Sequence, residues 1–155
     1  MHKRIDLKTL AAVKGSSYPA PFSLPCADRS RQRLGGAAGL TDFGVNLLRL
    51  APGAWSSQRH WHMAEDEFLF VLEGEVVLVT DAGEEMLRPG DCAGFKAGNA
   101  DGHHLQNRSA RDAVVLEIGS RRRELDEVFY PDIDLHLPRG SSGYHHKDGK
   151  PYETR

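Results

Sequence analysis

The stretch QRHWHMAEDEFLFVLEG, residues 58–74, places two histidines one residue apart just before a run of strand-forming residues. Side chains on a β-strand alternate between two faces, so His60 and His62 share one face, together with Gln58. On a helix, residues two apart diverge by roughly 200°, which would separate the two imidazoles. The Val- and Phe-rich run that follows favours the strand.

Glu67 is a candidate partner of these histidines, although it lies five positions after His62. On one continuous strand this odd offset would turn Glu67 to the opposite face, so the intervening MAED segment must form a turn or irregular link. Two imidazoles and a carboxylate that converge match the two-histidine, one-carboxylate arrangement of divalent metal sites. Taken alone, the HxH pattern instead favours two surface histidines on an edge strand beside a solvated acidic loop.

Composition limits the classes of protein that this chain can be. It has 155 residues, 39% of them hydrophobic and 27% charged, which fits one globular domain with one core. The formal net charge of −2 gives no reason to expect a nucleic acid or a membrane as partner. The basic N-terminus lacks an apolar block of signal-peptide length, which predicts a cytoplasmic protein. Cys26 and Cys92 lie far apart, so we expect two reduced thiols.

The chain divides into three parts by its pattern of apolar and turn-forming residues. Residues 1–40 are irregular and proline-containing, which indicates an arm or covering segment. Residues 41–120 hold many short alternating runs separated by Gly, Pro and Asp, which is typical of an all-β barrel or sandwich. Residues 121–155 begin with RRRELDEVF, which predicts a solvated helical turn, and end in a polar tail.

Residues 53–74 resemble the first conserved motif of the cupin family. The matching positions are Gly53, His60, His62, Glu67 and Gly74. This chain has one residue more after the first glycine than the motif usually shows. The second cupin motif resembles residues 90–107, and its matching positions are Gly90, Gly98, His103 and Asn107. The resemblance covers roughly residues 41–120 and is nearest to the small single-domain bacterial cupins, which include a sugar-phosphate isomerase-like group.

Two departures from the family pattern affect the second motif. Lys96 stands where the family usually has proline, which relaxes a turn but removes no ligand. The loop before His103 is two residues longer than usual, which leaves His103 and His104 as alternative ligands. Strand alternation puts His103 on the same face as Asn107, and we therefore expect His103 to point inward.

The resemblance implies an all-β double-stranded β-helix, a jelly-roll barrel with a metal ion inside. Its implied ligands are His60, His62, Glu67 and His103. An octahedral Mn, Fe, Co or Ni ion would keep two positions open, whereas Zn more often prefers four ligands. Gln58 and Asn107 are possible pocket residues; the alternative for Gln58 is a polar residue at the barrel mouth.

Three classes of function remain open at this point. We favour a metalloenzyme that carries out isomerase-type proton transfer on a small sugar or hydroxy acid. An Fe(II)-dependent dioxygenase and a non-catalytic small-ligand sensor are the alternatives. The sequence identifies no catalytic acid or base.

We also expect a homodimer. The aromatic residues Trp61, Phe68 and Phe70 lie opposite the proposed ligands and need cover of their own. Part of that cover is expected from the N-terminal arm of a second subunit, near residues 19–25. Lys96 is expected as an exposed turn lysine, and His145 and His146 as part of a flexible or docking tail rather than a second metal site.

Overall fold

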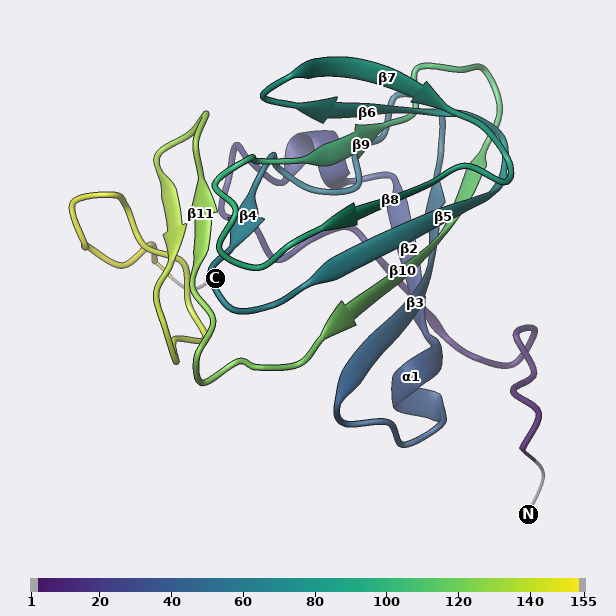
Figure 1. The fold of residues 1–155 in the computed structure, drawn as a ribbon, viewed down its shortest axis with the longest axis horizontal. Coiled ribbons are helices and arrows are strands. Elements are labelled where there is room, and N and C mark those ends of the chain that lie inside the picture. Colours follow the sequence, from purple (N-terminus) through teal and green to yellow (C-terminus); the bar gives the residue numbers. More distant parts are fainter. Residues whose placement is uncertain (1–2, 154–155) are drawn as a thin grey trace.

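Two layers of antiparallel strands face each other around an apolar core in the computed structural model, which describes residues 3–153 (Figure 1). The large sheet has the strand order β1-β2-β3-β10-β5-β8. Its strands are β1 (Ala12–Lys14), β2 (Arg29–Arg33), β3 (Phe43–Leu50), β10 (Ala113–Ser120), β5 (Glu67–Glu73) and β8 (Cys92–Phe95). This arrangement confirms the predicted all-β jelly roll.

The opposite layer joins two three-stranded sheets through the segment 53–60. One sheet is β7-β6-β9, formed by β7 (Gly83–Leu87), β6 (Val76–Thr80) and β9 (His104–Gln106). The other is β12-β11-β4, formed by β12 (Leu135–Leu137), β11 (Val128–Tyr130) and β4 (Trp61–His62). The segment 53–60 lies antiparallel to residues 103–107 and is bridged to them at Trp55–Gln106 and His60–His103. The short helices are η1 (Leu24–Cys26) and α1 (Leu34–Ala37).

The core follows from period-two alternation along the central strands. On β5, Leu69 and Val71 are buried, whereas Phe68, the residue before Leu69, is 41% exposed. The buried positions of both layers form one cluster. Its members are Leu48, Leu50, Ala54, Leu69, Val71, Val76, Leu78, Leu87, Leu105, Ala113 and Val115.

The two ends of the described chain pack on each other in a second apolar cluster. Val128, Tyr130 and Leu135 form its buried part, and Tyr18 and Phe22 are among the residues packed against it. After β10 the chain makes a single hydrogen-bonded turn in which the amides of residues 125 and 126 donate to one carbonyl at residue 122. That turn leads directly into β11.

The last described residues are part of this packed end, so of the two sequence-based alternatives, a flexible or a docking tail, the flexible one is wrong. His145 is bridged to His136 and to Pro151. His146 pairs with Asp134 at 2.7 Å, and its ring stacks on Tyr152. These contacts explain why a polar, glycine-containing segment is ordered here.

The N-terminal segment 1–40 contributes β1 and β2 to the large sheet. Its proline-containing part covers the chain's own C-terminal cluster through Tyr18 and Phe22. Cys26 is buried and Cys92 exposed, and both thiols are free, as predicted. Within residues 3–153, no helix has the length and hydropathy needed to cross a membrane.

The outer face of the large sheet carries two apolar rows that run across three strands. Register places Val45, Ile118 and Phe68 in one row. The second row is Leu47, Leu116 and Phe70. Trp61, by contrast, is covered within the chain because its ring stacks on Phe129 at 4.4 Å.

We propose that a second copy of the chain covers these rows. An apolar sheet face can pack on a second copy about a two-fold axis, and a net charge of −2 opposes this little. Phe68→Glu is expected to convert a dimer to a monomer of 17.2 kDa in light scattering at micromolar concentration. Val13→Glu, at a 54% exposed position on β1 outside the rows, should leave the dimer intact. A wild-type monomer would refute this proposal.

The turn between β5 and β6 generates a stability prediction. Gly74 has a φ of 72°, and a Cβ there would lie 2.5 Å from the Asp112 carbonyl oxygen. Gly53 has a φ of 83° but open space around its Cβ position. Gly53→Ala should therefore cost about 1 kcal/mol of unfolding free energy from backbone strain alone. Gly74→Ala should cost at least about 3 kcal/mol because steric overlap adds to the strain. Urea denaturation of both variants would measure the difference, and equal losses would contradict the steric argument.

Candidate metal centre

Hydrogen bonds of the backbone bring three histidines together at one end of the barrel. The bridge between His60 and His103 is closed by reciprocal amide–carbonyl bonds of 3.2 and 2.9 Å. His62 follows in β4, and Glu67 is the first residue of β5. Residues 63–66 lie outside both strands, so they provide the irregular link that the odd offset requires.

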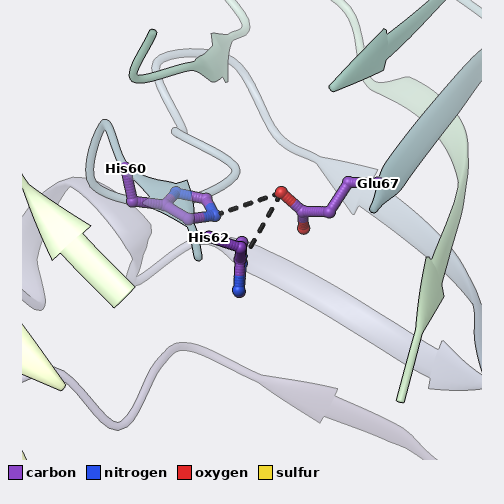
Figure 2. A group of neighbouring side chains, drawn as sticks. All are labelled: His60, His62 and Glu67. Carbon is purple, nitrogen blue, oxygen red and sulfur yellow. Dashed lines mark ion pairs between the residues drawn. The ribbon is translucent and has the colours of Figure 1, made fainter. Parts of the chain in front are cut away.

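All three imidazoles direct Nε2 toward one carboxylate oxygen. Glu67 Oε2 lies 2.8 Å from Nε2 of His103, 3.5 Å from that of His60 and 3.6 Å from that of His62. Figure 2 shows His60 and His62 on one side of this oxygen and Glu67 reaching toward them from the other. The structure therefore brings all four sequence-predicted ligands together.

The Glu67 oxygen at this point has the environment of a metal ligand. It is buried and has no hydrogen bond of acceptable geometry within residues 3–153, despite its three nitrogen neighbours. Two ligands bound at right angles about 2.1 Å from one ion would be about 3.0 Å apart, and tetrahedral ligands about 3.4 Å apart. The separations of the His60 and His62 nitrogens from Glu67 Oε2 are of this size, and the ligand atoms of these three residues all lie within 4.8 Å of one another, so this group fits a divalent ion. His103 lies beside the same oxygen but outside that group.

Neighbouring groups orient two of the rings by binding their Nδ1 atoms. His60 Nδ1 lies 2.8 Å from the Gln58 carbonyl oxygen, to which it can donate a hydrogen bond. His62 Nδ1 lies 2.6 Å from Asp126 Oδ2, and the other oxygen of Asp126 accepts the Ala64 amide. Each contact leaves Nε2 free to face Glu67, the arrangement usual around protein-bound metals.

Asp126 was not identified from the sequence as a site residue, because its acidic neighbourhood indicated a solvated helix. No spacing rule connects it to a histidine 64 positions earlier. The turn after β10 and the pairing of β11 with β4 bring them together.

The charges of the site compensate one another. Burial raises the pKa of Glu67, but the three imidazoles lower it more, so the pKa lies well below its usual range and the carboxyl is ionised. Burial lowers the pKa of His103, which keeps this ring neutral. For His62 burial is outweighed by the hydrogen bond to Asp126 and by the charge of Glu67, and its pKa is raised.

The structure places His103, and not His104, at the site. The ring of His103 stacks on Phe95 with centroids 3.5 Å apart. His104 points away and binds the Ser57 carbonyl oxygen through Nδ1 at 2.9 Å. Burial lowers the pKa of His104 to about 4.

Gln58, Asn107 and Lys96 lie outside the main cavity wall. Gln58 is buried, and its amide donates to the Phe22 carbonyl, because residues 56–59 bend and do not keep strand alternation. Asn107 is fully buried and donates to the carbonyls of Leu50 and Arg111. Lys96 pairs with Asp66 at 2.9 Å on the surface.

The candidate site opens into a cavity of about 380 Å³ lined by both layers of the barrel. Three tyrosines from three separate segments contribute to its wall: Tyr18, Tyr130 and Tyr144. The ring of Tyr130 lies 5.9 Å from that of His60 and 5.7 Å from that of Tyr18. These tyrosines could not be recognised from the sequence because they lie outside both motifs and follow no recognisable spacing.

Comparison with known proteins relates this geometry to a family. A family model described as a cupin domain matches residues 46–119. A sugar phosphate isomerase of the cupin superfamily from Silicibacter pomeroyi is 44% identical, with a TM-score of 0.91 over 97% of this chain and 96% of that one. No curated protein sequence matches the chain.

Two further solved structures are similar. A proposed sugar phosphate isomerase from Acidithiobacillus ferrooxidans is 28% identical, with a TM-score of 0.77 over 92% of this chain and 89% of that one. The polyketide cyclase RemF from Streptomyces resistomycificus is 20% identical, with a TM-score of 0.63 over 81% and 84% of the two chains. The last likeness concerns the fold alone.

Adjacent histidines allow a matched test of the metal site. His103→Ala removes an imidazole that faces Glu67, whereas His104→Ala removes one that does not. We expect His103→Ala to lose stoichiometric divalent metal, and His104→Ala to retain it. Metal analysis of purified protein measures this, with thermal unfolding to confirm that each variant folds. Retention by His103→Ala, or equal loss in both folded variants, would contradict the assignment.

Proposed function

Because this chain belongs to the cupin superfamily, we propose that it is a metal-dependent enzyme that isomerises a small sugar phosphate. The observation that carries the proposal is the convergence of three imidazole Nε2 atoms on the buried Glu67 oxygen inside a cavity. The relative from Silicibacter pomeroyi, similar over nearly the whole chain, supports the choice of substrate class.

His60, His62, Glu67 and His103 would hold the divalent ion. When bound, such an ion would polarise the hydroxyl and carbonyl oxygens of an α-hydroxy carbonyl substrate and so acidify the hydrogen on the hydroxyl-bearing carbon next to the carbonyl. The ionised Glu67 and the neutral His103 ring have the protonation states that this role requires. Mn, Fe, Co, Ni and Zn remain candidate ions.

Isomerisation also needs a group that moves a proton, and we assign this role to Glu65. Its carboxylate lines the cavity, and a ligand atom of Glu65 lies within 4.8 Å of those of His62 and Asp126. Oε1 accepts the Arg122 amide at 2.6 Å, which fixes the carboxylate while the other oxygen stays available. Glu117, another acid of the wall, is held by Arg31 through two hydrogen bonds.

The tyrosines of the wall would act as hydrogen-bond donors to substrate oxygens. Burial raises the pKa of Tyr18 and of Tyr130 above the ordinary value, so both hydroxyls keep their protons near neutral pH. Apolar wall residues, among them Leu69, Phe95 and Leu105, limit the water around the reacting carbon. We further propose that the protein acts in the cytoplasm, where its two free thiols stay reduced.

Substitution of Glu65 tests the assigned proton transfer. Glu65→Gln keeps an oxygen that can accept the Arg122 amide but removes the base. Solvent deuterium incorporation into a sugar phosphate by metal-loaded protein should fall about 100-fold. Metal content should stay unchanged, because Glu65 is not among the four proposed ligands.

Glu75→Gln is the matched control, because this exposed carboxylate lies outside the cavity wall. Full exchange in Glu65→Gln would refute the role of Glu65. Turnover only with Fe(II) and O₂ would favour a dioxygenase instead. Tight binding of sugar phosphates, without exchange or turnover under any metal, would favour a sensor.

A further inference from the structure

The cavity wall contains more arginine than its own acids neutralise. Five arginines line it: Arg29, Arg31, Arg33, Arg121 and Arg123. Two of them serve the fold. Arg29 is buried and donates to the carbonyls of Gly15 and Ser56. Arg31 forms a bidentate pair with Glu117 at 2.7 and 2.8 Å.

The other three arginines have no such partners. Within residues 3–153, no carboxylate lies within ion-pair distance of Arg33, Arg121 or Arg123, and none of these guanidinium groups donates a hydrogen bond to the protein. The remaining acids of the wall do not compensate them. Glu67 is compensated by the imidazoles, and Glu65 accepts a backbone amide. The wall therefore presents three unpaired positive charges.

Sheet register places Arg33 and the strand end next to Arg121 at the same end of the barrel as the candidate metal centre, and Arg123 lines the same cavity. Arg33 ends β2 opposite Asn46, near the start of β3. β10 ends at Ser120, one residue before Arg121, and Gly119 pairs with Glu67. At one end of the large sheet, β2 and β10 therefore finish where β3 and β5 begin.

Gly44 allows the guanidinium of Arg121 to lie directly on the sheet at this end of the strands. A Cβ at residue 44 would be 2.6 Å from Nη2 of Arg121 and 2.8 Å from its Nε. Any side chain at this position would displace Arg121. The bare backbone of Gly44 therefore lets the positive group lie over the strand, within the cavity wall.

We propose that Arg33, Arg121 and Arg123 form a subsite for the phosphate monoester of the substrate. A phosphate dianion offers three terminal oxygens, and guanidinium groups bind such oxygens with paired hydrogen bonds. A carboxylate offers less charge and only two oxygens, so it matches three arginines less well. This proposal rests on the proposed function, which places the reacting sugar end of the substrate at the metal centre.

The side chain of Arg122 provides a matched control because it lies between two of these residues in sequence but outside the cavity wall, and Arg122→Gln keeps the backbone amide that holds Glu65. Calorimetry would compare glucose 6-phosphate with glucose on metal-loaded protein, and inorganic phosphate on metal-free protein. The variants are Arg33→Gln, the double variant Arg121→Gln/Arg123→Gln, and Arg122→Gln. Circular dichroism checks the folding of each.

We expect the loss of each cavity arginine to weaken the binding of glucose 6-phosphate and of inorganic phosphate about tenfold. Glucose should bind as it does to the wild type, and Arg122→Gln should bind both phosphates normally. Gly44→Ala should also weaken phosphate binding, as the loss of Arg121 does. Glucuronate, which carries a carboxylate in place of the phosphate, should bind more weakly than glucose 6-phosphate.

An equal loss of phosphate affinity in Arg122→Gln would attribute the effect to general surface charge and overturn the subsite. Phosphate affinity that stays unchanged in every arginine variant would also overturn it. Glucuronate binding as tightly as glucose 6-phosphate would overturn the phosphate assignment. Arginine-dependent phosphate binding without deuterium exchange would support the subsite while refuting the isomerase. If all arginine variants exchange solvent deuterium into sugar phosphates at the wild-type rate and bind them with wild-type affinity, the isomerase would be supported and the subsite refuted.

Discussion

One carboxylate oxygen, Oε2 of Glu67, constrains the rest of the interior. A buried anion without partners is costly, and here three imidazoles from the opposite layer surround it. The same residue opens β5, whose alternation then sends Leu69 and Val71 into the core and Phe68 outward. A slip of one residue would expose the carboxylate and bury Phe68, so core and site specify the same register.

The parts of the structure that could be predicted depend on local patterns. Short alternating runs separated by turn residues indicate the two-layered β fold. The spacing of His60, His62 and Glu67 indicates a ligand set, although the set becomes convincing only with the second motif. Alternation also selects His103 over His104, because the bridge to His60 keeps that part of the chain regular.

The parts that could not be predicted depend on contacts between distant segments. The RRRELDEVF run predicts a solvated helical turn, and the chain makes one there, but nothing in the run predicts that this turn delivers Asp126 to His62. Gln58 leaves the face of the histidines because the chain bends at residues 56–59, where a period of two no longer applies. The tyrosine wall requires Tyr18 and Tyr144 to meet across almost the full chain, with ring centroids 5.4 Å apart.

The contact between the two ends of the chain can form only when synthesis is almost complete, because it needs residues from both ends. All four proposed ligands lie between residues 60 and 103, and the two facing sheets are complete at residue 120, apart from β11 and β12. Tyr130 and Tyr144 emerge from the ribosome only later and then close the wall together with Tyr18. A nascent chain that has reached β10 thus presents its histidines on a barrel still open on one side.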